Sequence, residues 1–238
     1  FDDVIAQEHI TDLLKKAIES KRVHHAYLFC GPRGIGKTSC ARILAMCLNA
    51  EKGPTVKPDL NSPTAQEIIK GNSLDVIEID GASNRGIDEI RSLRENIKFA
   101  SNYGRYKIYI VDEVHMLTME AFNALLKTLE EPPEHVKFIF ATTEPNKLPS
   151  TIISRTQRFD FKRIPIQRIN HTLKIIAKDE KLKIDEDALF AISKAAQGSL
   201  RDALSVLDQM SALGDRKIQS DDVYSMLGLV ETQYLFAL

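Results

Sequence analysis

The sequence predicts an α/β fold in which a five-stranded parallel sheet is flanked by helices and is followed by a small, entirely helical domain. Two observations support this prediction. Up to Phe161, apolar runs of five or six residues alternate with helical runs, which is typical of a parallel sheet buried on both faces. Beyond Phe161 the chain shows only helical periodicity. We therefore expect an α/β domain in residues 1–163 and a helical domain in residues 164–238.

The expected strands are short and alternate with helices along the chain. The strands cover residues 25–30, 75–80, 106–111, 136–141 and 157–161. Apolar residues at helical spacing predict the helices. These cover residues 10–18, 39–46, 88–100, 121–129, 166–181, 187–196, 201–212 and 221–228, with a short turn or helix over 148–154. Pro132 and Pro133 end the helix before the fourth strand, because proline disfavours helical backbone at the preceding residue.

One stretch, residues 50–73, departs from this alternation. It contains Pro54, Pro58 and Pro63 and few large apolar residues. Prolines and small polar residues that cluster between periodic segments are typical of loops. We therefore expect an insertion or a long loop here.

Composition limits the class of protein. The 238 residues are 43% hydrophobic, which is enough for a core, and no run approaches the roughly 20 apolar residues of a membrane helix. The start of the chain lacks a signal peptide's features and an initiator Met, so a fragment is expected. Three cysteines in apolar surroundings favour a reducing cytoplasm. With a net charge of −1, any nucleic-acid binding must use a local basic patch.

A glycine-rich loop lies between the first strand and the next helix. It reads Gly31-Pro32-Arg33-Gly34-Ile35-Gly36-Lys37-Thr38, a GxxxxGK[ST] pattern in the strand–loop–helix context that makes it a P-loop rather than a chance turn. Glycines let backbone N–H groups curl around a polyanion, and the N-terminus of the helix that opens at Ser39 adds partial positive charge. Lys37 would reach the β- and γ-phosphates of a nucleotide, and Thr38 would bind Mg²⁺.

Two carboxylates end the third strand. Asp112 is placed to hold Mg²⁺, and Glu113 is placed to polarise an attacking water. The alternative is that both are merely solvated. A carboxylate base of its own favours an ATPase over a GTPase, and Asn146-Lys147 is not continued into the guanine-reading Asn-Lys-x-Asp pattern.

Three further side chains remain ambiguous from the residues alone. Thr143 follows the fourth strand and either bonds the γ-phosphate or lytic water or simply ends the strand. Arg155 precedes the fifth strand, and Arg201 opens a helix. Without further context, each arginine would be an ordinary surface residue.

The order of these motifs resembles one family. The sequence is similar to AAA+ ATPases of the clamp-loader group, and most of all to the gamma/tau family of bacterial DNA polymerase III subunits. The resemblance covers the whole chain. The segments that carry it are residues 31–38, Ala82–Gly86, Asp112–Thr118, Asn123–Pro133, Ala141–Pro149, Ser154-Arg155 and Gly198–Asp202.

The resemblance implies roles for the ambiguous residues. Thr143 would be the sensor-1 residue, and Arg201 would be the sensor-2 residue on a helical lid. Arg155 would be an arginine finger that acts in trans on the ATP site of a neighbouring subunit. Val4, Ile5 and His24 would lie near the adenine. The finger sits in the family's Ser-Arg-Cys motif, where this chain has Thr156 after the arginine.

The resemblance also implies an activity and partners. The chain would bind ATP and Mg²⁺ and hydrolyse ATP to open a sliding clamp and load it on primer–template DNA, in a ring with other clamp-loader subunits. Polymerase activity would be that of the holoenzyme. Two alternatives are a non-hydrolysing scaffold subunit and another AAA+ DNA motor such as a branch-migration helicase. DNA contact is expected near Ser83–Arg85 and at Arg91, Arg94 and Lys98, which otherwise form a solvated face.

One departure from the family pattern concerns zinc. The family usually carries four cysteines with C-x8-C-x2-C-x2-C spacing after the P-loop helix. The positions that match them here are Ala50, Asp59, Ser62 and Ala65. One carboxylate cannot replace four good ligands, so no zinc is expected. The family's third domain, an oligomeric collar, would begin near Leu238.

Overall fold

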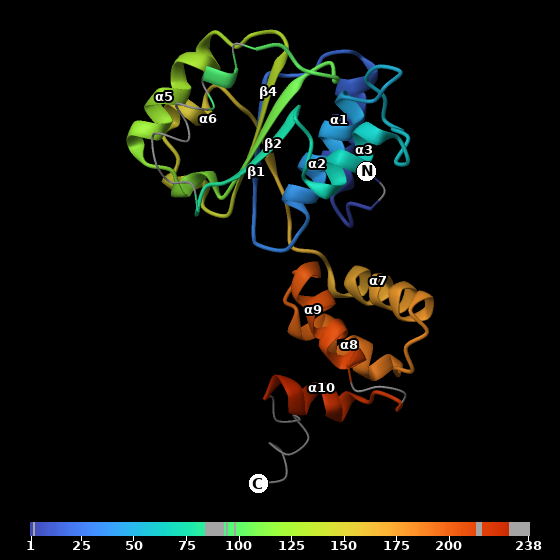
Figure 1. Ribbon diagram of the computed structural model, residues 1–238. Coiled ribbons are helices and arrows are strands. Elements are labelled where there is room, and N and C mark those ends of the chain that lie inside the picture. Colours follow the sequence, from blue (N-terminus) through green and yellow to red (C-terminus); the bar gives the residue numbers. More distant parts are fainter. Residues whose placement is uncertain (2, 84–92, 94, 98, 213–215, 229–238) are drawn as a thin grey trace. The chain divides into compact units, whose positions relative to one another are not determined.

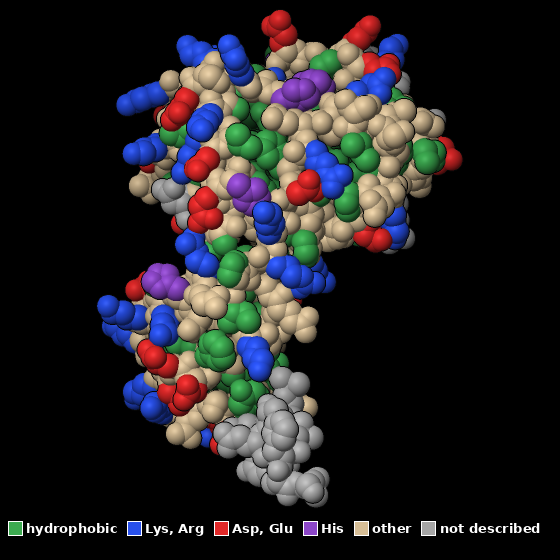
Figure 2. Space-filling model, turned by 180° about the vertical axis from the view of Figure 1, so that it is seen from behind, with side chains coloured by type: hydrophobic (Ala, Val, Ile, Leu, Met, Phe, Trp, Pro, Cys, Tyr) green, Lys and Arg blue, Asp and Glu red, His purple; other side chains and the backbone are tan. Residues whose placement is uncertain are grey.

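The computed structural model describes residues 1, 3–83, 93, 95–97, 99–212 and 216–228. The chain forms two compact units, which we describe separately. The first contains residues 1–31 and 36–161 and holds the sheet, and the second contains residues 32–35 and 162–238 and is helical (Figure 1). Lys/Arg and Asp/Glu side chains are interspersed on the face shown in Figure 2, in keeping with the net charge of −1.

The first unit is built on a parallel sheet whose strand order is β2-β3-β4-β1-β5. The strands are β1 (Ala26–Cys30), β2 (Val76–Asp80), β3 (Lys107–Asp112), β4 (Val136–Thr142) and β5 (Gln157–Asp160). The five-stranded parallel sheet expected from the sequence is confirmed. β1 and β4 are buried along their whole length because both faces are covered by helices.

Helices cover the two faces of this sheet. α1 (Glu8–Glu19), α2 (Lys37–Leu48) and α3 (Pro63–Lys70) lie on one side, and α5 (Met119–Glu130) and α6 (Ser150–Ile153) lie on the other (Figure 1). Short 3-10 turns, η1 (Val114–Met116) and η2 (Pro145–Lys147), follow β3 and β4. Under α5, the rings of Tyr109 and Phe140 each stack on Phe138 with centroids 5.6 Å apart. This apolar layer fixes the strand ends that carry the site.

The loop expected over residues 50–73 is only partly correct, because residues 63–70 form α3. The Ser62 hydroxyl accepts a hydrogen bond from the Ala65 N–H, and Pro63 occupies the first helical position, where its missing N–H costs nothing. Ala65 and Ile68 are buried, and Gly71 ends the helix at φ 72°. Pro63, which by itself indicates a loop, therefore begins a helix here.

The expected helix over 88–100 is described only at a few positions. Ile90, Leu93 and Ile97 lie on one face of the expected helix, and of these Leu93 and Ile97 are buried. The third, Ile90, lies outside the described residues, as do Arg85 and the DNA-contact candidates Arg91, Arg94 and Lys98.

The second unit consists of helices, as expected for a lid. They are α7 (Ile166–Asp179), α8 (Glu186–Ala195), α9 (Leu200–Ser211) and α10 (Ser220–Leu227). α8 packs against the other three helices. The side chains of Asp185 and Ser199 cap α8 and α9 by accepting backbone N–H groups.

A buried carboxylate holds the turn before β3. Asp75, only 4% exposed, accepts hydrogen bonds from the backbone N–H groups of Asn102, Tyr103 and Gly104 at 2.6–2.7 Å. Burial alone would raise the pKa of Asp75, but the Gly104, Asn102 and Tyr103 donors outweigh it and lower the pKa below its ordinary value. The charged form of Asp75 therefore stabilises the fold.

Asp75→Asn is expected to lower the free energy of unfolding by roughly 2–3 kcal/mol, because the amide turns a donor toward N–H groups that need an acceptor. The measurement is urea unfolding, with the exposed Asp59→Asn as the control. Since the native pKa is lowered, the contribution of Asp75 is complete above the unfolded-state pKa of about 3.9 and is lost as the pH falls through the native value. Equal stability of the two variants at pH 7 would contradict this role.

Candidate active site

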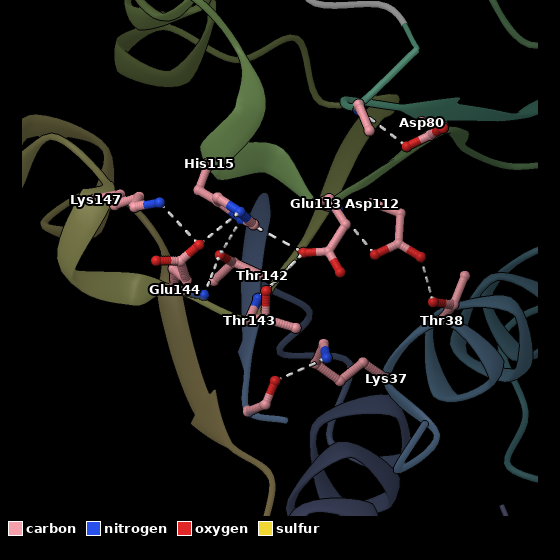
Figure 3. A network of polar contacts seen from close by, with 12 residues as sticks. Lys37, Thr38, Asp80, Asp112, Glu113, His115, Thr142, Thr143, Glu144 and Lys147 are labelled. Atoms are coloured by element: carbon pink, nitrogen blue, oxygen red, sulfur yellow. Dashed lines mark hydrogen bonds and ion pairs between the residues drawn. The ribbon is translucent and has the colours of Figure 1, made fainter. Parts of the chain in front are cut away.

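The P-loop lysine points back into its own loop. Gly31 leaves β1, and its N–H donates to the Thr142 carbonyl of β4 at 3.1 Å. Gly36, at φ 97°, is the N-cap of α2, and Lys37 is the first residue of that helix. The Lys37 Nζ is 2.8 Å from the Gly31 carbonyl oxygen (Figure 3), and the residue is 6% exposed. A buried ammonium at a helix N-terminus suits an anionic ligand.

The predicted Mg²⁺ ligands lie side by side. The Thr38 hydroxyl donates to Asp112 Oδ2 at 2.6 Å, and Asp112 Oδ1 accepts from the Glu113 N–H at 2.8 Å (Figure 3). A hydroxyl and a carboxylate are the hard oxygen ligands that Mg²⁺ prefers. Strand order explains the pairing, because β4 and β1 bring the end of β3 to the start of α2.

Glu113 is held by the residue that follows β4. Its Oε2 accepts hydrogen bonds from the Thr143 N–H at 3.3 Å and from the Thr143 hydroxyl at 3.0 Å. The Glu113 backbone is left-handed at φ 45°, an uncommon conformation for a residue other than glycine. The residues alone left the role of Thr143 open, and the resemblance implied a place in the ATP site; the structure brings Thr143 into contact with Glu113.

His115 is a site residue that sequence reasoning did not single out. Its Nδ1 lies 3.0 Å from Thr142 Oγ1 and 3.4 Å from Glu113 Oε2, and its Nε2 lies 3.3 Å from Glu144 Oε1. Only 5% of the side chain is exposed. Lys147 donates to Glu144 at 2.9 Å, and this bond lowers the pKa of Glu144. A continuous polar network thus joins Glu113 to the surface (Figure 3). Its signal in the sequence was the spacing Asp112-Glu113-Val114-His115.

Arg155 lies far from this group. Gln157 of β5 pairs with Tyr27 of β1, so Arg155 is level with His25, before β1 begins, whereas Gly31 follows the end of β1. Six residues of parallel strand span about 20 Å, well beyond the reach of an arginine side chain. The Arg155 guanidinium therefore does not approach the P-loop lysine of its own chain.

Of the three residues that the resemblance places near the adenine, Val4 and Ile5 lie near the start of α2, and His24 does not. Val4 is buried, and its Cγ1 lies 3.9 Å from the position that a Cβ on Gly36 would take, so it adjoins the start of α2. Ile5 follows it and is partly buried. The His24 ring lies against the His25 ring in a tilted arrangement with centroids 4.2 Å apart, at the end of β1 opposite to Gly31. The structure thus groups His24 with His25 and not with the P-loop.

Residues 32–35 of the P-loop belong to the helical unit together with Arg201. The Arg201 N–H donates to the Gly34 carbonyl at 3.2 Å. Gly34 has φ 74°, and a Cβ on it would lie 2.0 Å from the Ser199 hydroxyl oxygen and 3.2 Å from Arg201 Cβ. Only glycine fits at this position. Arg33 and Ile35 flank this contact, while Ser39 lies in the first turn of α2.

The three cysteines are buried free thiols. Burial raises the pKa of Cys30 to about 11 and those of Cys40 and Cys47 to about 12, so the thiols stay protonated. Within the described ranges, no three His, Cys, Asp or Glu side chains form a group that could hold a metal ion. The same part of the chain has no helix that is both long and apolar enough to cross a membrane.

Comparison with known proteins identifies the family. The family described as "DNA polymerase III, delta subunit" matches residues 6–165, and that described as "DNA polymerase III clamp loader subunit, ATPase lid domain" matches residues 168–216. The chain belongs to the DNA polymerase III clamp-loader subunit family. It is 52% identical to DNA polymerase III subunit tau of Bacillus subtilis over 99% of this chain and 42% of that protein. It is 47% identical to DNA polymerase III subunit tau of Escherichia coli, over 100% of this chain and 37% of that protein.

The chain therefore spans about two fifths of the length of these tau subunits. Among solved structures, the RuvB Holliday junction branch migration motor of Thermotoga maritima matches with a TM-score of 0.69. The two are 20% identical, and the match covers 96% of this chain and 70% of that one. At this identity the likeness concerns the fold alone.

Proposed function

We propose that this clamp-loader family member binds and hydrolyses ATP as a motor subunit of the bacterial sliding-clamp loader. The observation that carries this proposal is the meeting of Thr38, Asp112 and Glu113 beside a P-loop lysine. A scaffold that only holds its neighbours needs no such set of residues. Hydrolysis of ATP to ADP and phosphate is the reaction that this set supports best.

Each residue has a role in this proposal. Backbone N–H groups of Gly31–Thr38 and the Lys37 ammonium bind the phosphates, and Thr38 and Asp112 would hold Mg²⁺, which neutralises developing charge when bound. Glu113 accepts a proton from the attacking water, and Thr143 orients the Glu113 carboxylate. Val4 and Ile5 would border the adenine.

The remaining roles concern the assembly. We propose that residues 164–238 form the lid and that Arg201 on it reaches the nucleotide of its own subunit. Arg155 completes the site of a neighbouring subunit, for which its distance from its own P-loop is the support. The partners would be other clamp-loader subunits, the sliding clamp and primer–template DNA, in the cytoplasm. A second candidate, favoured only by the RuvB-like fold, is another AAA+ DNA motor.

The test is ATP turnover by the full-length protein in complex with partner subunits, with and without clamp and primed DNA. We expect weak turnover alone and stimulation when clamp and primed DNA are both present. Turnover that responds to four-way junctions and ignores the clamp would favour the second candidate. A complex without turnover under every condition would favour a scaffold.

Lys37→Ala is expected to abolish ATP binding, because the buried ammonium that faces the P-loop is lost. Calorimetric titration with ATP and Mg²⁺ measures this, with Lys52→Ala on the exposed loop as the matched control. Tight ATP binding by Lys37→Ala would contradict the P-loop assignment.

A further inference from the structure

We infer that Glu130 is a positioning residue that fixes the Arg155 guanidinium for its role at the neighbouring subunit's ATP site. This inference rests on the trans role of Arg155 proposed above. Arg155 NH2 donates to Glu130 Oε1 at 2.7 Å, and Arg155 NH1 donates to the Thr151 carbonyl at 2.9 Å. Glu130 ends α5, and Thr151 lies in α6, so the guanidinium is tied to two helices that pack on each other.

The bonds leave part of the guanidinium available. Arginine has five N–H donors in one plane. Within the described part of the chain, NH1 uses its donors on Thr151 and Ser154, NH2 uses one on Glu130, and the Nε–H has no acceptor. The Arg155 side chain is 32% exposed. A fixed plane with free donors at an exposed edge is suited to a phosphate brought by another subunit.

The position of Glu130 is not explained by helix stability. A carboxylate in the last turn of a helix faces the negative end of the helix dipole and is unfavourable there. The Glu130 side chain is 51% exposed, and exposed ion pairs contribute little to stability. The ion pair instead restricts the Arg155 side chain before the neighbouring subunit binds. Less conformational entropy is then lost when the shared ATP site assembles.

The backbone beneath the pair is also anchored. Pro132 and Pro133 follow α5 and fix its end. Burial and the nearby His24 and Lys137 lower the pKa of His25. The backbone groups of Arg155 and Leu129 act on the same ring and oppose this lowering. The partly buried ring of His25 thus lies near both segments that carry the ion pair.

The test uses the full-length protein in the assembled clamp-loader complex with clamp and primed DNA. We expect Glu130→Gln to lower kcat between about 10- and 100-fold with the KM for ATP unchanged, because the finger is misplaced but the chain's own ATP contacts remain. Glu130→Asp should restore part of the rate. Glu131→Gln, on the next residue, is the matched control and should turn over as the wild type does.

A double variant separates positioning from any other role. If Glu130 acts through Arg155, Glu130→Gln combined with Arg155→Ala should turn over no more slowly than Arg155→Ala. If the double variant turned over more slowly than Arg155→Ala by the same factor that Glu130→Gln loses alone, the inference would be overturned. A wild-type kcat for Glu130→Gln, in a complex where Arg155→Ala is impaired, would overturn it as well. Wild-type turnover by Arg155→Ala would instead overturn the trans role itself. Thermal unfolding of Glu130→Gln should match the wild type, since an unfolded variant would make Glu130 a structural residue and overturn the inference.

Discussion

Replacing Arg155 with alanine is expected to lower ATP hydrolysis in the assembled complex by about 10³-fold or more while ATP binding stays near the wild-type level. The reason is geometric. Arg155 precedes β5 at the level of His25, and its own P-loop leaves the other end of β1, about 20 Å away. We therefore expect the guanidinium to stabilise transition-state charge at a site that another subunit brings to it.

Mixing two inactive variants decides whether the role is in trans. In complexes that contain both Arg155→Ala and Lys37→Ala chains, the intact P-loop of the first can be completed by the intact arginine of the second. We expect partial recovery of steady-state turnover in the mixture. A mixture as inactive as each variant alone would contradict the trans role. Arg22→Ala removes one positive charge at an exposed position and is the control for the loss of charge in Arg155→Ala.

Glu113→Gln is expected to lower hydrolysis by about 10²- to 10⁴-fold and to leave ATP binding intact. Glutamine keeps the size of the side chain and accepts hydrogen bonds from Thr143, but it cannot take a proton from water. Single-turnover hydrolysis and ATP titration, measured on the same complex, separate the two effects.

The exposed Glu51→Gln is the control for this variant. A Glu113→Gln complex that hydrolyses ATP at the wild-type rate would remove Glu113 from the mechanism. Equal inactivity of the wild type and Glu113→Gln in a complete complex would instead support the scaffold alternative.

Much of the site was predictable because its signals are local. The loop Gly31–Thr38 and the pair Asp112-Glu113 each follow a buried strand, and the carboxyl ends of parallel strands meet at one edge of a sheet. His115 was missed because the spacing Asp112-Glu113-Val114-His115 does not show which side chains the histidine ring contacts. Its contacts are with Thr142, the last residue of β4, and with Glu144, just beyond that strand.

The helix α3, which lies within the loop expected over residues 50–73, was missed for a similar reason. Pro63 in isolation is a loop signal, and its place at the first turn of α3 depends on the Ser62 cap and on burial of Ala65 and Ile68 against the P-loop helix. The resemblance placed His24 near the adenine, while the strand register groups it with His25 at the far end of β1.

By itself the sequence determined the alternation of strands and helices, the P-loop and the carboxylates at the end of β3, because apolar periodicity and glycine spacing act over a few residues. Only the tertiary structure decided which side chains meet. The order β2-β3-β4-β1-β5 brings Asp112 to Thr38 and Glu113 to Thr143. The β1–β5 register separates Arg155 from Lys37, and the packing of α6 on α5 brings Arg155 to Glu130. Such contacts join segments remote in the chain, and their register is set by strand pairing and packing that no local pattern records.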